Sequence, residues 1–252
     1  KLFCQSLRRQ NAAPWFFASR SKALPVPNTT GRSAHRTDLM RTIGREDFTA
    51  FDWDAVDAGH GRHLPQLALK GAIYFVTFRL EDSVPQKLLK QWLYKRQAWL
   101  AEHPEPWDET TRREHRSLFT ARMERWLDAG YGGCLLRDER CRREVVDRLL
   151  FKHGQDYDLG DWVVMPNHVH VLLKPLGEVS LEEIMKPVKG VSARNINHLL
   201  GRSGSLWMQE SFSHIVRSLE QLKKFQCYIQ TNPMKAHLPA PDFSYEQRWQ
   251  IV

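Results

Sequence analysis

Two spacings of apolar residues recur along the chain from about residue 70 onward. In "IYFVTFRL" (73–80) almost every position is β-branched or aromatic and alternate side chains face opposite ways, which is typical of a strand. The same pattern predicts strands at 73–80, 157–165, 168–174 and 210–217. Apolar residues spaced three or four apart predict helices within 85–129, 137–154, 180–200 and 218–232.

The order of these elements predicts an α+β fold. Strands alternate with helices, and the two middle strands are joined tightly through Pro166-Asn167. This order fits a ferredoxin-like β-α-β-β-α-β core, an antiparallel sheet with helices on one face. The segment 85–129 then forms a helical insertion after the first strand, divided into two helices by "HPEPWDE", with Asp108 capping the second.

The remaining parts of the chain have weaker patterns. Residues 1–60 are rich in Ser, Arg, Pro, Gly and Asp, and we expect a poorly ordered or non-native extension there, with Met40 as a candidate start. Residues 61–240 form the expected domain, and 241–252 a C-terminal tail.

Composition narrows the class of partner. Hydrophobic residues make up 42% and charged residues 26%, as in ordinary globular proteins, and no apolar run approaches the roughly 18 residues of a membrane span. The net charge of +8 favours an anionic partner such as nucleic acid. The four cysteines show no C-x-x-C pair, which fits free thiols in a reducing, cytoplasmic compartment.

The stretch "MPNHVH" places two histidines on a predicted strand. Because side chains alternate, His168 and His170 share one face at roughly 7 Å between their Cα atoms, close enough to ligate one cation. The H-x-H pair alone is a weak motif, and two hydrogen-bonded histidines at a sheet edge are the simpler interpretation. Candidate further ligands, His198 and His214, fit structural roles better.

Two polar residues of the last helix add to this pattern. Tyr228 and Asn232 are four residues apart and share one helical face. A phenol with its ordinary pKa near 10 is a poor nucleophile unless a base or a metal-polarised electrophile helps it. The Asn232 carbonyl oxygen suits a hard cation beside two imidazoles. A core tyrosine and a helix-terminal asparagine remain the simpler interpretation of this pair alone.

Together, "WVVMPNHVHVLL", "LWMQESFSHIVRS" and "YIQTNPMKAHL" resemble the single-tyrosine, IS200-like HUH transposases, in particular the branch of REP-associated tyrosine transposases. "GRHLPQLALKGAIYFVTFRLEDS" resembles the opening of that branch's domain, so the resemblance covers about residues 61–240. It implies the HUH single-tyrosine nuclease fold and a transposase that nicks and joins single-stranded DNA at REP-like hairpins.

The resemblance also implies residue roles. His168 and His170 match the HUH metal pair, Tyr228 the nucleophile that forms a 5′-phosphotyrosine, and Asn232 the polar residue that completes the metal site. Two imidazoles favour Mn²⁺ or Zn²⁺ over Mg²⁺, whereas the family implies Mg²⁺ or Mn²⁺. With no thiolate or third histidine to specify zinc, we expect Mn²⁺ or Mg²⁺.

Candidate DNA contacts are diffuse. Basic side chains on the last two predicted helices suit phosphates, although a solvated basic face explains each of them as well. They are Lys186, Lys189, Arg194, Lys223, Lys224 and Lys235. Trp207 suits stacking on an unpaired base, but a core position suits it equally.

Two other functions compete with a transposase. A hairpin-DNA-binding regulator that does not cut would have no need of a tyrosine beside a metal site. Another HUH endonuclease, such as a relaxase or replication initiator, usually belongs to a larger chain. We expect a cytoplasmic, nucleoid-associated protein without membrane contact, acting as a monomer or homodimer.

Overall fold

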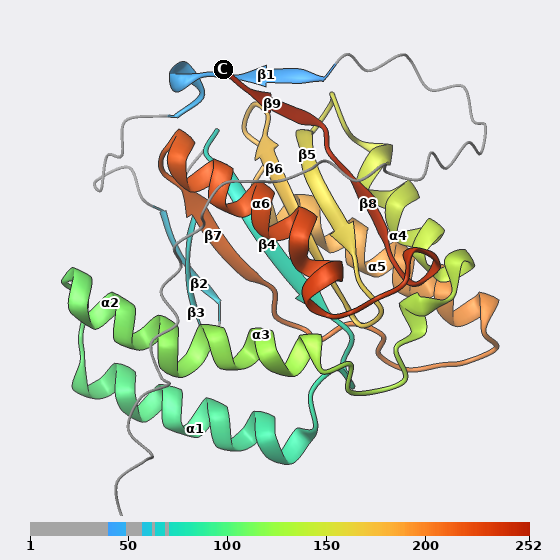
Figure 1. The fold of residues 1–252 in the computed structure, drawn as a ribbon, viewed down its shortest axis with the longest axis horizontal. Helices are drawn as coiled ribbons and strands as arrows, with labels where there is room; N and C mark the ends of the chain where they lie inside the picture. The colour runs from blue at the N-terminus through green and yellow to red at the C-terminus, as the bar shows by residue number, and fades with distance from the viewer. Residues whose placement is uncertain (1–39, 49–56, 62–63, 69–70) are drawn as a thin grey trace, which may run out of the picture. The chain divides into compact units, whose positions relative to one another are not determined.

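The computed structural model describes residues 40–48, 57–61, 64–68 and 71–252 (Figure 1). Most of the extension expected at 1–60 therefore lies outside the described residues. Among the described helices, none is long and apolar enough to cross a membrane.

An antiparallel five-stranded sheet forms the centre of the structure. Its strands are β4 (Ile73–Arg79), β5 (Tyr157–Val164), β6 (His168–Pro175), β7 (Phe212–Val216) and β8 (Ser244–Glu246). They are arranged in the order β7-β4-β6-β5-β8, so β4 and β6 are central. Every neighbouring pair is antiparallel. The expected α+β class with an antiparallel sheet is confirmed.

Two helices cover one face of this sheet. Helices α4 (Glu139–Phe151) and α5 (Leu181–Leu199) contribute Val145 and Ile196 to a core that also holds Phe78. The capping box expected at the start of α5 is present: Ser180 Oγ accepts from Glu183 N, and Glu183 Oε2 accepts from Ser180 N.

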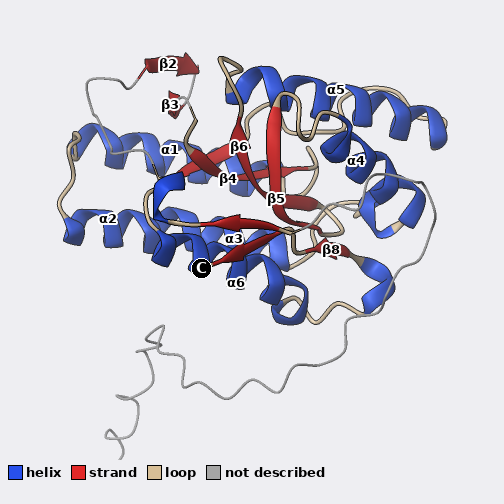
Figure 2. Ribbon diagram, turned by 90° about the horizontal axis from the view of Figure 1, so that it is seen from above, coloured by secondary structure: helices blue, strands red, loops and turns tan. Residues whose placement is uncertain are grey.

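The last helix packs on the opposite face. Helix α6 (Leu219–Lys235) places Leu222 and Ile229 against Phe75 and Leu172 in a second core. The expectation of helices on one face therefore holds for α4 and α5 but is wrong for α6. The reason is that β4 is apolar on both sides, so each face of the sheet requires a cover. Figure 2 shows α4 and α5 on one side of the sheet and α6 on the other.

The insertion after β4 is helical, as expected. It contains α1 (Gln86–Glu102), α2 (Glu109–His115), a π-helical turn (Arg116–Thr120) and α3 (Ala121–Asp128). Asp108 caps α2 by accepting from Thr111 N at 2.7 Å, as its position predicted. Leu89 of α1 and Leu127 of α3 pack together in a separate small core.

Packing continues past residue 240, the expected end of the domain. Strand β8 extends the main sheet, and β9 (Trp249–Ile251) pairs in parallel with β1 (Arg41–Ile43). The Trp249 ring is fully buried against Gly160, where an added Cβ would lie 2.7 Å from the ring. The remaining strands, β2 (Asp57–Gly61) and β3 (Leu64–Ala68), form an antiparallel hairpin. Short 3-10 helices occupy Arg45–Asp47, Leu135–Arg137 and Ala240–Asp242.

Candidate metal and nucleophile site

The two histidines lie at the start of a central strand. The chain turns after Met165, so that β6 begins at His168. Opposite them on β4 lie Arg79, which pairs with His168, and Thr77, which pairs with His170. Directly opposed residues of antiparallel strands project to the same face. All four side chains therefore face the side of the sheet that α6 covers (Figure 1).

Both imidazoles are buried and neutral. His168 is 1% exposed and His170 2%, and their ring centroids are 4.7 Å apart. Burial lowers the pKa of His168 to about 3. Burial, and in second place the electrostatic effect of the neighbouring His168, hold the pKa of His170 well below its usual range. Neutral imidazole is the form that ligates a metal.

Hydrogen bonds fix the Nδ1 side of each ring. Asn167 donates from Nδ2 to the carbonyls of Leu127 and Tyr131, both at 3.2 Å, so its Oδ1 faces His168 Nδ1 at 2.8 Å. An amide oxygen only accepts, so His168 carries its proton on Nδ1 and presents a lone pair at Nε2. His170 Nδ1 lies 2.7 Å from Thr77 Oγ1, which is able to fix the same tautomer.

The opposite side of each ring has no partner. Among the described residues, the Nε2 atoms of His168 and His170 and both amide atoms of Asn232 are buried without a hydrogen bond of ordinary geometry. The Asn232 side chain does lie close enough to Tyr228 to act on its hydroxyl, which lowers the pKa of that phenol against the effect of burial. Buried polar atoms are rarely left unpaired, so such atoms call for an explanation. Asn232 itself is 1% exposed.

Tyr228 joins these groups from α6. Its ring centroid is 5.0 Å from that of His170, in an edge-to-face arrangement, and 5.9 Å from that of Phe75. Lys235 lies over the Tyr228 ring with Nζ 5.2 Å from the centroid. The ring contacts join His168, His170 and Tyr228, and the side-chain interaction of Asn232 with Tyr228 adds the fourth residue that the sequence singled out.

The donor set fits a divalent cation. Two imidazole nitrogens and an amide oxygen suit Mn²⁺, and less readily Mg²⁺. Within the described ranges, no group of three or more His, Cys, Asp or Glu side chains is placed to hold a metal. Asn232 is therefore the third protein ligand that this arrangement offers.

Two carboxylates of the insertion act on Tyr228. Burial raises the pKa of Tyr228 well above its ordinary value, and the charges of Glu124 and Asp128 on α3 raise it further. Burial also raises the pKa of Asp128 to about 6. The resting tyrosine is therefore a neutral phenol. The sequence did not point to either carboxylate, because two acidic residues four apart on a helix are typical of a solvent-exposed face.

Thr77, Arg79 and Asn167 were also missed. A signal for the first two exists: they are the polar positions, two residues apart, in the otherwise apolar "YFVTFRL". Asn167 directly precedes the first histidine but was read only as part of a turn. His198 is exposed on α5 and His214 lies on β7 beside Phe225, so neither joins the pair.

The expected DNA contacts do not form one surface. Lys186 and Arg194 are exposed on α5, on one side of the sheet. The exposed lysines of α6 are Lys223, Lys224 and Lys235, on the opposite side. Lys224 is paired with Glu220 at 2.8 Å.

Two of the residues that we expected to contact DNA, Lys189 and Trp207, make interactions within the protein instead. Lys189 Nζ donates to the carbonyls of Met208 and Gln209 and to Ser211 Oγ, which uses its three N–H donors. Trp207 is 5% exposed, donates to Ser192 Oγ at 3.1 Å and packs on Phe78. The structure therefore corrects the stacking role expected of Trp207, because its ring belongs to the core.

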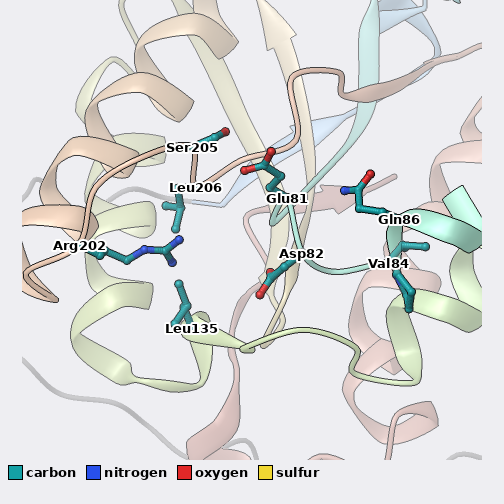
Figure 3. Close-up of a pocket in the computed structure, with 9 residues that line it drawn as sticks. Glu81, Asp82, Val84, Gln86, Leu135, Arg202, Ser205 and Leu206 are labelled. Carbon is teal, nitrogen blue, oxygen red and sulfur yellow. The ribbon is translucent and has the colours of Figure 1, made fainter. Parts of the chain in front are cut away.

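A pocket of about 370 Å³ is lined by residues other than the candidate metal ligands and Tyr228 (Figure 3). Glu81 and Asp82, after β4, line it together with Arg202 and Leu206 from the segment between α5 and β7. Neither histidine, nor Tyr228 or Asn232, contributes to it.

Fold and site together define a ferredoxin-like α+β protein in which two buried histidines on the sheet face a tyrosine on a covering helix. Residues 142–232 match the family model described as "Transposase IS200 like", a span that includes both histidines, Tyr228 and Asn232. This segment is therefore similar to the IS200-like transposase family. No curated protein sequence matches the chain.

Two solved structures are similar to the chain. One is described as the structure of a REP-associated tyrosine transposase bound to a REP hairpin, with 18% identity, a TM-score of 0.37, and 68% of this chain and 71% of that chain covered. The other is a provisionally assigned transposase from Deinococcus radiodurans R1, with 18% identity, a TM-score of 0.28, and 69% and 97% covered.

Proposed function

We propose that this chain is a transposase that nicks and rejoins single-stranded DNA, with Tyr228 as nucleophile. The observation that carries the proposal is a set of buried nitrogen and oxygen atoms beside that tyrosine, each able to ligate a metal and without an ordinary hydrogen bond. His168 Nε2 and His170 Nε2 have no hydrogen-bond partner, the Asn232 amide has none of ordinary geometry, and Tyr228 lies edge-on against the His170 ring. A structural core gains nothing from orphaned polar atoms, whereas a metal-assisted site uses them.

The proposed reaction exchanges one phosphoester for another. Tyr228 Oη gives up its proton and attacks the scissile phosphorus, the bond from phosphorus to the 3′-oxygen breaks, and the released 3′-oxygen takes up one proton, so that the number of protons is unchanged. The product is a 5′-phosphotyrosine and a free 3′-hydroxyl, and attack by a second 3′-hydroxyl reverses the exchange. A divalent cation, bound by His168, His170 and Asn232, would withdraw charge from the phosphate oxygens.

The chain's own residues set the starting state of this reaction. Asn167 and Thr77 hold the imidazoles so that Nε2 faces the site. The charges of Glu124 and Asp128 keep Tyr228 protonated, because they raise its pKa beyond the effect of burial. The nucleophile is thereby protected from forming a free tyrosinate before substrate is bound.

We propose hairpin DNA with a single-stranded flank as the substrate. The net charge of +8 supports a nucleic-acid partner. The exposed lysines of α6 lie on the same helix as Tyr228, where a phosphate backbone entering the site would meet them.

The test is capture of a covalent protein–DNA adduct. Single-stranded hairpin oligonucleotides are incubated with the protein and Mn²⁺ or Mg²⁺ and then separated on a denaturing gel. An adduct is expected with the wild-type chain and not with Tyr228→Phe. Tyr94→Phe is the matched control, because Tyr94 is 76% exposed on α1.

Two results would contradict the proposal. An adduct that persists in Tyr228→Phe excludes this nucleophile. Binding without any adduct, across a panel of hairpins and both metals, favours a non-cleaving hairpin-DNA-binding regulator.

A further inference from the structure

A buried arginine lies beside the histidine pair. Arg79 is the cross-strand partner of His168, shares its face of the sheet, and is 9% exposed. Its guanidinium makes one hydrogen bond within the described part of the chain, from Nη1 to Ser83 Oγ at 3.0 Å. Since a guanidinium has five N–H donors, most of its bonding capacity is unused.

Arg79 also lacks a full counter-charge. No carboxylate among the described residues lies within ion-pair distance of it, and the acidic side chain whose charge acts on it is Glu210, just before β7. Arg79 is 9% exposed, so its charge is largely held away from water. A buried charge without a partner is strongly unfavourable.

Glu210 is shared with two further cations. Its charge also acts on Arg96 of α1 and on Lys189 of α5. Lys189 is committed to the backbone of residues 208 and 209, and so holds the segment that carries Glu210 in place. The Cζ atom of Arg96 lies 5.8 Å from the centroid of the Trp92 ring. The charge of Glu105 also acts on Arg96. Arg79, Arg96 and Lys189 therefore share the charge of Glu210.

We propose that Arg79 binds a backbone phosphate of the DNA strand next to the His168–His170 pair. This inference rests on the proposed function and adds a protein contact for the strand. A phosphate supplies both missing elements, because it carries negative charge and accepts paired hydrogen bonds from a guanidinium. Because Arg79 lies on the same face of the sheet as the two histidines, a phosphate bound to Arg79 would fix the DNA strand relative to Tyr228.

The test couples one side chain to one phosphate. Binding is measured in a Tyr228→Phe background without divalent metal, so that no cleavage occurs. The probes are hairpin oligonucleotides in which single phosphates are replaced by neutral methylphosphonates. Proteins with Arg79 intact, with Arg79→Gln and with Arg143→Gln are compared. Arg143 is the control, because its side chain is 67% exposed on α4, on the opposite face of the sheet.

The expected result is a position-specific loss. Arg79→Gln weakens binding about tenfold, the scale of one charge-assisted contact. With Arg79 intact, a methylphosphonate at one position lowers the DNA affinity by a similar factor. The same substitution in the DNA lowers the affinity of Arg79→Gln little further. Arg143→Gln leaves the response to every position unchanged. Arg79→Lys, which keeps the charge but not the paired donors, restores part of the affinity and serves if Arg79→Gln does not fold.

The outcomes separate this inference from the proposed function. Equal responses of all variants at every phosphate overturn the Arg79 site, even if the wild-type chain forms its covalent adduct. Position-specific coupling without any adduct supports the phosphate site and overturns strand cleavage. Loss of affinity in Arg79→Gln that is equal for every probe assigns Arg79 to folding or general charge and also overturns the site.

Discussion

The Nδ1 atom of His168 lies 2.8 Å from Oδ1 of Asn167, its immediate neighbour in the chain. Side chains of adjacent strand residues normally point to opposite faces, but Asn167 belongs to the turn before β6 and is free to bend back. Its amide nitrogen is held by two carbonyls at the end of the insertion. The insertion is thereby connected, through one side chain, to the orientation of a proposed metal ligand.

Asn167→Ala is expected to weaken Mn²⁺ binding about 10- to 100-fold, the usual effect of removing a group that orients a metal ligand. The ring of His168 would lose the acceptor that fixes its tautomer. Isothermal titration with Mn²⁺ measures the affinity, and circular dichroism checks the fold. Asn195→Ala is the control, because Asn195 bonds Glu144 away from the site. Equal metal affinity in both variants would remove the positioning role.

Asn232→Ala is expected to change metal binding far more than stability. Both amide atoms of Asn232 are buried without a hydrogen bond of ordinary geometry, so their removal relieves a desolvation cost of about 1–3 kcal/mol that offsets the lost packing. Ile229→Ala, one turn earlier and fully buried, should instead cost about 2–5 kcal/mol. Urea unfolding without metal compares the two variants. A loss for Asn232→Ala as large as that for Ile229→Ala would contradict the assignment.

Trp207→Phe should leave DNA affinity unchanged and lower the free energy of unfolding. The indole donates to Ser192 Oγ within the core, and loss of that bond costs about 1 kcal/mol beyond the lost packing. Thermal unfolding and oligonucleotide binding are measured on the same preparation. If Trp207→Phe folds with wild-type stability and binds DNA weakly, the ring contacts DNA after all.

His214 should make the fold sensitive to acid. Burial, with the charges of Arg217 and Arg116, lowers the pKa of His214 to about 4 from 6.5. The unfolded chain takes up this proton below pH 6.5, whereas the folded chain resists until about pH 4. Stability from neutral His214 is therefore complete above pH 6.5 and is lost as the pH falls towards 4.

His214→Gln removes this proton uptake. Between pH 7 and pH 4, the wild-type chain should lose about 3 kcal/mol more unfolding free energy than the variant. Urea unfolding at a series of pH values gives both curves, and the other buried histidines contribute equally to each. Parallel curves would show that His214 has an ordinary pKa in the folded protein.

The sequence by itself determined the strands β4 to β7, the helices α4 to α6 and the four residues of the proposed site. Apolar residues that alternate in a strand, or recur every three or four positions in a helix, form a local pattern. The face on which each residue lies depends only on its own position in the strand or helix. The histidine pair on one strand face and the Tyr228 and Asn232 pair on one helix face follow from that rule. The same holds for the caps at Asp108 and Ser180, which act within one turn.

Only the tertiary structure decided what these faces meet. The register of β4 against β6 placed Thr77 and Arg79 opposite the histidines, and no local pattern encodes a pairing across about ninety residues. The packing of α6 on the face away from α4 and α5, the burial of Trp207 and the addition of β8 are likewise outcomes of closing both apolar faces of one sheet. Burial by distant segments, and not sequence spacing, also set the pKa values of His168, His170 and Tyr228. Desolvation depends on everything that surrounds a group, so it exists only once the chain has folded.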